Sequence, residues 1–196
     1  MELRYWSLLI FLGAIWGSAF MFIKIATPEL GAVFLVQLRL ALASLVFLPL
    51  LIRPKLLKLF IRSFKYILIL SLTNTAIPFI LFSEASNGSD SNMLAILNSS
   101  TALMTMFIAF FWLKEKITIK QIGGLILGFI GIVILVNPKN SSIDAYSALI
   151  CLAGSFCYAF SGVFIQKYCV SINKLVLIGW SLVIGTILLI PFSAFS

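Results

Sequence analysis

The most informative residues of this chain are the few charged and hydrogen-bonding side chains inside long apolar runs. Arg39 is the sharpest of them, because it lies eight residues beyond Gly31, where an apolar run begins, at a depth of about 12 Å along a helix. A charge at that depth in a bilayer is costly unless it faces water or a partner. Two interpretations stay open: Arg39 binds an anionic group of a substrate, or helix-end carbonyls, Gln37 and Asn98 satisfy it.

Other polar residues lie at similar depths in neighbouring apolar runs. Trp16-Gly17-Ser18 interrupts the first run and Asn98-Ser99-Ser100-Thr101 the fourth. In the third run Asn74 precedes Pro78 by about one helical turn, and the proline frees a backbone carbonyl for a kink, a hinge or a ligand contact. Such groups bind either a substrate or a neighbouring helix. We predict a substrate pathway lined by Trp16, Ser18, Arg39, Asn74, Asn98 and Thr101.

Lys24 and Glu84 each lie near the expected outer end of an apolar run. At matched height they predict an ion pair that serves as an outer gate, with Glu84 the one carboxylate placed to take up a coupling proton. The alternative is that Lys24 extends to the lipid headgroups.

Residue types that support catalysis or metal binding are scarce. The chain has no histidine, and its three cysteines, Cys151, Cys157 and Cys169, lack the spacing of a metal or redox motif. Glu115, in the turn Lys114-Glu115-Lys116, has no partner base in view and is expected to cap or pair locally. We therefore expect no enzyme activity, no metal and no cofactor.

The composition indicates an integral membrane protein. The chain is 62% hydrophobic and 10% charged, far from the roughly 25% charged residues of soluble domains. Its net charge of +8 comes from basic residues in short connections rather than on one polar face, which argues against nucleic acid as a partner. The expected partners are the lipid bilayer and a small-molecule substrate.

Seven apolar segments have the length of a membrane-spanning helix, so the sequence predicts an all-α fold. They are Trp6–Ala26, Gly31–Ile52, Tyr66–Phe82, Met93–Leu113, Ile117–Val136, Ala145–Val170 and Leu175–Phe195. The first two are expected to join at a turn, Thr27-Pro28-Glu29. The longest connection is expected to be a basic loop, Arg53–Lys65.

Lysine and arginine collect on alternate connections, with Lys24 and Lys139 as the exceptions at the edges of the other set. Because positively charged loops stay in the cytoplasm, we expect a cytoplasmic N-terminus and an outward C-terminus. Small residues at helical spacing predict close helix packing at Gly13, Gly17, Gly124, Gly128 and Gly131.

The chain also matches itself at an offset of 142 residues, which places Trp16 on Tyr158 and Pro49 on Pro191. Five spans separate the copies, so the second copy enters the membrane with the opposite orientation. Such inverted repeats are typical of transporters.

Four segments give the chain a family resemblance: Trp16–Phe20 (WGSAF), Arg39–Leu51, Ala95–Thr105 and Leu113–Leu135, the last with a basic and acidic turn before a glycine-rich helix. With these motifs the sequence resembles the EamA family of the drug/metabolite transporter superfamily. The resemblance implies ten helices in two five-helix repeats, both termini in the cytoplasm, and transport of small metabolites across the plasma membrane.

Two features depart from that pattern. Ala102 follows Thr101 where family members commonly have a proline, and the second repeat stops at Ser196 after two spans. We therefore expect one complete repeat at 1–137 and an incomplete one at 145–196, about seven transmembrane helices in all, with a second chain or copy as a candidate to complete the bundle.

Two functions remain open at this point. The first is transport of a small organic solute, an amino acid or another metabolite, by alternating access. The second is a truncated remnant without transport activity, or an accessory membrane subunit.

Overall fold

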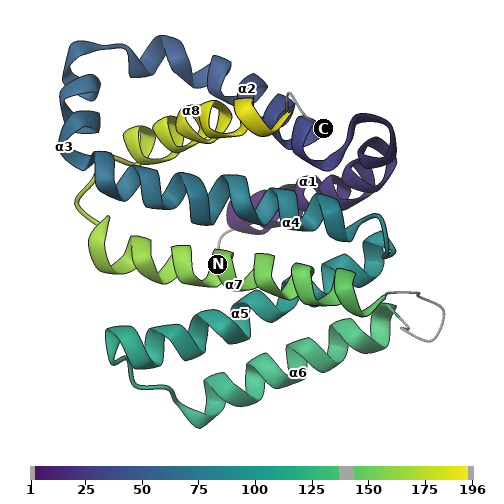
Figure 1. Cartoon of the computed structure of the whole chain (residues 1–196). Helices are drawn as coiled ribbons and strands as arrows, with labels where there is room; N and C mark the ends of the chain where they lie inside the picture. The colour runs from purple at the N-terminus through teal and green to yellow at the C-terminus, as the bar shows by residue number, and fades with distance from the viewer. Residues whose placement is uncertain (1–2, 137–143, 194–196) are drawn as a thin grey trace.

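The computed structural model describes residues 3–136 and 144–193, and it contains only helices over these residues (Figure 1). They are α1 (Leu3–Leu30), α2 (Ala32–Leu51), α3 (Pro54–Leu70), the π-helical segment η1 (Ser71–Ala76), α4 (Ile77–Ala85), α5 (Ser91–Leu113), α6 (Ile119–Val136), α7 (Ala145–Tyr168) and α8 (Lys174–Ser193). Six helical runs are long and apolar enough to cross a membrane, and α6 contains a shorter apolar helix, Ile119–Gly131. Six of the seven expected spans overlap these runs, and the seventh, Ile117–Val136, overlaps α6. The described part of the chain is helical throughout its regular structure, and the chain is a multi-pass membrane protein.

The expectation of a basic loop at Arg53–Lys65 is wrong, because α3 begins at Pro54 and continues through η1 and α4 as one run to Ala85. Proline suits the first position of a helix, where its missing N–H leaves no bond unmade. Leu56 and Phe60 then pack against a buried apolar cluster that α3 shares with α7 and α8. The segment is helical because its apolar residues recur at helical spacing toward this cluster.

The first two helices join at Gly31 rather than at the expected turn Thr27-Pro28-Glu29. Pro28 lies inside α1, and Gly31 has a φ of 73°, a left-handed conformation that glycine adopts without steric cost. The chain reverses at the residue that tolerates the reversal.

The core is built from two close helix contacts (Figure 1). Helix α8 packs antiparallel to α2, where a Cβ placed on Gly179 would lie 2.8 Å from Leu51 Cδ1 and one on Gly185 would lie 3.1 Å from Leu40 Cδ1. Helix α7 lies between α4 and α5, and Gly154 faces the ring of Phe82. These glycines let the backbones approach where no side chain fits.

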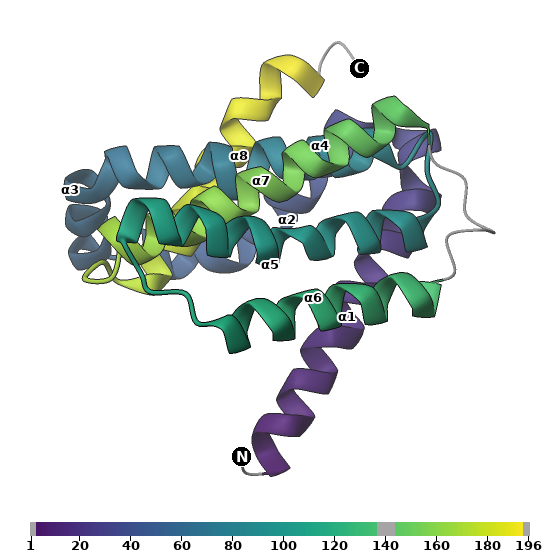
Figure 2. The same cartoon turned by 90° about the horizontal axis from the view of Figure 1, so that it is seen from below.

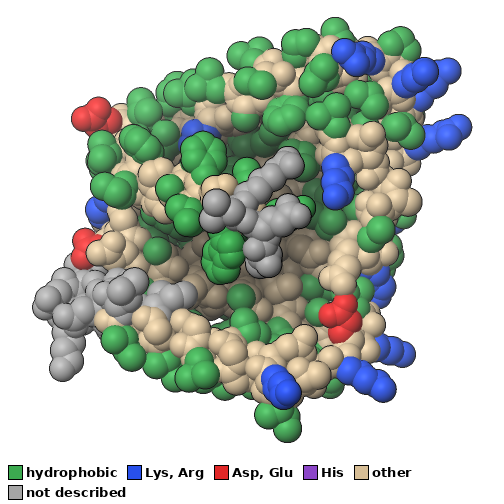
Figure 3. Space-filling model, turned by 180° about the vertical axis from the view of Figure 1, so that it is seen from behind, with side chains coloured by type: hydrophobic (Ala, Val, Ile, Leu, Met, Phe, Trp, Pro, Cys, Tyr) green, Lys and Arg blue, Asp and Glu red, His purple; other side chains and the backbone are tan. Residues whose placement is uncertain are grey.

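The basic connections lie at one end of the bundle. The links from α2 to α3, from α5 to α6 and from α7 to α8 share the left end of Figure 1, and Lys and Arg side chains gather along one edge of the space-filling view in Figure 3. This arrangement agrees with the expected alternation of charge. Lys139 lies outside the described residues.

Helix α1 is the least embedded of the candidate spans, with 6% of its most apolar window buried. Figure 2 shows its N-terminal half pointing away from the other helices. Its C-terminal half stays against α4 and α5.

We predict that Gly179→Val lowers the stability of the folded protein by about 1–3 kcal/mol, because overpacking forces buried side chains to shift. Leu51, which the new side chain would meet, is fully buried. The measurement is thermal unfolding of the purified protein in detergent. Gly128→Val is the matched control, since nothing lies within 4 Å of a Cβ at Gly128; equal losses for both variants would contradict the close contact at Gly179.

Candidate functional site

Arg39 projects from α2 toward α4 and stays half-buried. Its guanidinium carbon lies 5.0 Å from the centre of the Phe79 ring, a cation–π distance, and that ring in turn contacts Tyr158. Neither Gln37 nor Asn98 hydrogen-bonds to it, and it has no hydrogen-bond acceptor among the residues that the structure describes. None of the five guanidinium N–H donors is therefore used by a described residue.

Aromatic rings from three helices form the wall beside Arg39. Tyr158 of α7 packs edge-on against Phe79, with 6.2 Å between ring centres, and stacks on Phe82 at 5.7 Å. Phe20 of α1 meets Phe82 edge-on at 5.9 Å. The rings fix the orientation of Phe79, which in turn holds the guanidinium.

Asn74 lies in η1 next to this aromatic group. Ser161 of α7 is fully buried, and its single hydroxyl proton has two acceptors within reach: Asn74 Oδ1 at 3.0 Å and the carbonyl of Tyr158 at 3.0 Å. Pro78, four residues after Asn74, cannot donate an α-helical hydrogen bond, and the amide of Ile77 bonds five residues back to Leu72. The expected kink is therefore a π-helical turn, a feature often found at functional sites.

Asn98 and Thr101 lie on α5, where they meet each other but not Arg39. Thr101 Oγ1 lies 3.4 Å from Asn98 Oδ1, and the hydroxyls of Ser99 and Ser100 donate to carbonyls three residues earlier. Ser155 of α7 donates to the carbonyl of Leu97 at 3.3 Å. The observed bonds of this polar run are within α5 and between α5 and α7. Its role in binding a substrate stays a prediction.

Trp16 and Ser18 are not brought to the Arg39 group. Trp16 is 68% exposed, and Ser18 donates to the carbonyl of Ile15 within its own helix at 2.9 Å. Both lie on α1, whose N-terminal half leaves the bundle. Their place in a substrate pathway also stays a prediction.

The five glycines predicted to mediate packing have no close neighbour in this part of the chain. Nothing among the described residues comes within 4 Å of a Cβ placed at any of them: Gly13, Gly17, Gly124, Gly128 and Gly131. Within the described bundle they bring no two helices together, and a role at some other surface stays a prediction. The close contacts are at Gly154, Gly179 and Gly185 instead.

Lys24 holds the α4–α5 turn rather than Glu84. Its ammonium donates to the carbonyls of Ser86 at 2.6 Å and Ser89 at 2.8 Å. The structure records no ion pair between Lys24 and Glu84, which is half-buried at the end of α4. The predicted gate pair is therefore not formed in this conformation, and a proton-carrying role for Glu84 stays a prediction.

Asp144 links the start of α7 to the α4–α5 turn at the same end of the bundle. Its amide donates to the carbonyl of Gly88 at 3.2 Å, and its carboxylate accepts from the amide and hydroxyl of Ser147 at 2.7 and 2.9 Å. These two bonds, the backbone amide first, hold the pKa of Asp144 below its ordinary value. The group is a helix cap that stays ionised down to acidic pH.

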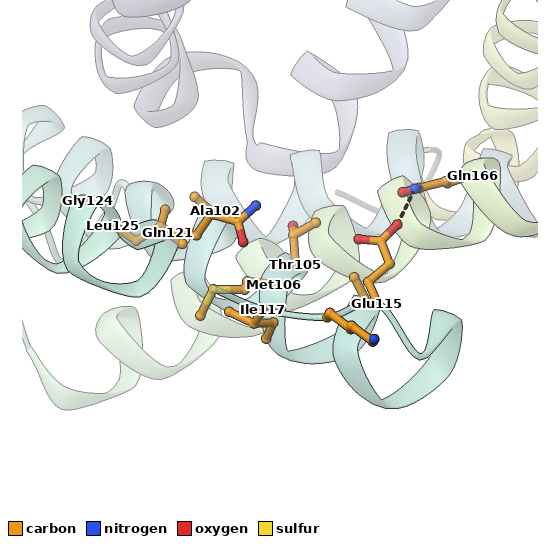
Figure 4. Close-up of a pocket in the computed structure, with 11 residues that line it drawn as sticks. Ala102, Thr105, Met106, Glu115, Ile117, Gln121, Gly124, Leu125 and Gln166 are labelled. Carbon is orange, nitrogen blue, oxygen red and sulfur yellow. Dashed lines mark hydrogen bonds between the residues drawn. The ribbon is translucent and has the colours of Figure 1, made fainter. Parts of the chain in front are cut away.

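A cavity of about 480 Å³ lies elsewhere, between α5, α6 and the end of α7 (Figure 4). Thr105, Gln121 and Gly124 line it, and at one side Gln166 of α7 donates to Glu115 Oε1 at 2.6 Å. Glu115 thus pairs across to α7, where a local cap or pair was expected. The cavity shares no residue with the Arg39 group.

Three residues of the Arg39 group are not predicted from the sequence: Phe79, Tyr158 and Ser161. The 142-residue offset, which pairs Tyr158 with Trp16, was the one signal for Tyr158. Among 18 phenylalanines nothing in the sequence distinguishes Phe79. The described residues contain no group of three or more His, Cys, Asp or Glu side chains arranged to hold a metal ion.

Comparison with known proteins finds one matching family and one similar protein. The model of the EamA-like transporter family matches residues 4–137. A protein of Archaeoglobus fulgidus described as an uncharacterized transporter is 22% identical over 192 residues, which are 97% of this chain and 67% of that protein. No solved structure matches the chain significantly. The match over residues 4–137 covers more than half of the sequence and agrees with the resemblance of its motifs, and the chain therefore belongs to the EamA-like transporter family, a family of membrane transporters.

Proposed function

We propose that this protein moves a small organic solute that carries a carboxylate or phosphate group, such as an amino acid or another metabolite, across the plasma membrane. The observation that carries the proposal is the half-buried guanidinium of Arg39, which has a ring beside it and no hydrogen-bonded acceptor in the described structure. Arginine binds carboxylates and phosphates through two parallel N–H bonds. An intramembrane cation that no described acceptor or carboxylate neutralises is best explained by a ligand that does so.

Alternating access is the proposed mechanism, with the two ends of α7 as its gates. At one end Asp144 bonds to Gly88. At the other end Lys167 donates to the carbonyl of Trp112 at 3.1 Å and lies 5.0 Å from the Trp112 ring centre, beside the Glu115–Gln166 bond. If the contacts at one end of α7 break while those at the other end stay formed, the Arg39 group would be exposed to one side of the membrane at a time.

The proposed architecture is a complete five-helix repeat at 1–137 followed by the first two helices of an inverted repeat at 145–196. The antiparallel contact of α2 with α8 supports it, because these would be the second helices of the two repeats. The N-terminus is proposed to be cytoplasmic, because basic residues collect on alternate connections of the sequence, beginning with Arg4. An accessory subunit, or a bundle completed by a second copy, is the second candidate, which the exposed Trp16 on α1 favours.

We predict that Arg39→Gln weakens binding and uptake of anionic solutes by about tenfold or more, because the charge-assisted hydrogen bonds are lost. Binding and uptake of neutral analogues should stay unchanged. Arg39→Lys keeps the positive charge but loses the planar guanidinium, so its affinity for anionic solutes should lie between those of the wild type and Arg39→Gln. Binding is measured as ligand-induced thermal stabilisation of purified protein and uptake in vesicles. Lys120→Gln is the control for loss of one cation. Equal loss for neutral and anionic solutes would instead make Arg39 a structural anchor.

We also propose that uptake is coupled to protons through Glu84, so that an imposed pH gradient stimulates uptake by the wild type. Glu84→Gln should abolish this stimulation, since the amide cannot carry a proton. Uptake without a gradient should change little. The measurement is the initial rate in vesicles with and without the gradient, and Glu29→Gln, an exposed carboxylate at the end of α1, is the matched control. A variant that keeps the full stimulation would remove Glu84 from the coupling mechanism.

A further inference from the structure

The first turns of α3 form a basic helix that the transport site does not use. Every basic residue of this segment is exposed, and no Asp or Glu occurs between Arg53 and Glu84. The basic residues are Arg53, Lys55, Lys58, Arg62 and Lys65. The segment carries five positive charges with no internal counter-charge.

The helix sorts its residues onto three faces. Spacings of three, four and three residues put four cations on one face: Lys55, Lys58, Arg62 and Lys65. A second face packs on the protein, where the ring of Phe60 stacks on Trp180 of α8 at 4.0 Å. A third face is apolar yet exposed, with Leu57 at 39%, Ile61 at 67% and Phe64 at 46%.

The length of the helical run places this segment outside the hydrocarbon layer. Pro54–Ala85 has 32 residues, about 48 Å at the helical rise, against a hydrocarbon core of about 30 Å. About a dozen residues must therefore lie at or beyond the membrane surface. The charges identify these as the first ones, because the rest of the run contains a single charged residue, Glu84, at its far end.

Position, charge and apolar exposure together define a helix that lies in the membrane interface. Figure 1 shows the first turns of α3 at the end of the bundle, and Figure 3 shows basic side chains along one edge of the molecule. Interfacial helices of this kind place apolar side chains among the acyl chains and basic ones beside the headgroups. Juxtamembrane basic clusters attract anionic lipids.

We propose that the basic face of α3 binds the phosphate groups of anionic phospholipids in the adjoining leaflet. The four cations of that face contact the headgroups, and Ile61 and Phe64 enter the acyl region beside them. The stacking of Phe60 on Trp180 fixes the rotation of the helix, so the basic face is presented to the lipid rather than turned at random.

The test is lipid retention by the whole protein, reconstituted in nanodiscs of equal parts phosphatidylglycerol and phosphatidylcholine and then extracted. Lipids that stay bound are counted by native mass spectrometry. The wild type should retain phosphatidylglycerol with a roughly fivefold preference, which should fall toward one at about 0.5 M salt because exposed charges are screened.

The decisive variant exchanges the two outer faces without changing composition or charge: Leu57→Lys, Lys58→Leu, Ile61→Arg and Arg62→Ile together. All four positions are exposed, so the core contact of Phe60 is untouched, and the preference should be lost. If this variant does not fold, Lys55→Gln, Lys58→Gln and Arg62→Gln together should have the same effect.

Removal of three cations elsewhere is the matched control: Lys114→Gln, Lys116→Gln and Lys120→Gln together should keep the preference. Three results would each overturn the proposal. They are equal retention of both lipids by the wild type, full preference in the face-exchanged protein, and an equal loss in the control.

Discussion

Acyl chains offer no hydrogen bonds, so an apolar bundle has to satisfy its polar groups from within the protein. The described helices meet this constraint locally, as when the hydroxyls of Ser44, Thr73 and Ser99 donate to carbonyls of their own helix. Lys24 meets it by donating to carbonyls of a neighbouring turn. Arg39 departs from it, because among the described residues its guanidinium faces an aromatic ring and no hydrogen-bond acceptor. The buried hydroxyl of Ser71 and the indole N–H of Trp180 also lack a hydrogen-bond partner in this part of the chain, but they carry no charge. That contrast with Lys24, more than its depth, is the basis for proposing that Arg39 binds a ligand.

The positions of most apolar helices could be predicted from the sequence, because a membrane span is defined by the length of an apolar run. It was insufficient at Arg53–Lys65, where mean hydropathy is the same for a basic loop and for an amphipathic helix. The repeat of apolar residues at Leu56 and Phe60 was the neglected signal. At the first turn the sequence predicts a break at Pro28, but the backbone reverses at Gly31, where a positive φ is allowed.

The glycines and the site show the other limit of sequence reasoning. Spacing on one helix identifies a smooth face but not the partner, and close approach occurs where a large buried side chain lies opposite, as Leu51 does at Gly179. Arg39 and Asn74 were predicted because polar residues are rare in apolar runs. Tyr158 and Ser161 were not, because their role depends on how α7 packs against α4 and η1, which no local pattern specifies.

The π-helical segment η1 has a consequence for comparing this chain with other sequences. A π-helical turn holds one residue more than an α-helical turn, so the residues on either side of Ser71–Ala76 follow two helical registers. Removing one residue there would restore a single register and rotate Phe79 by about 100°, away from Arg39. A homologue whose alignment shows a one-residue gap in this segment would therefore place other side chains beside the corresponding arginine, even if every remaining position were identical.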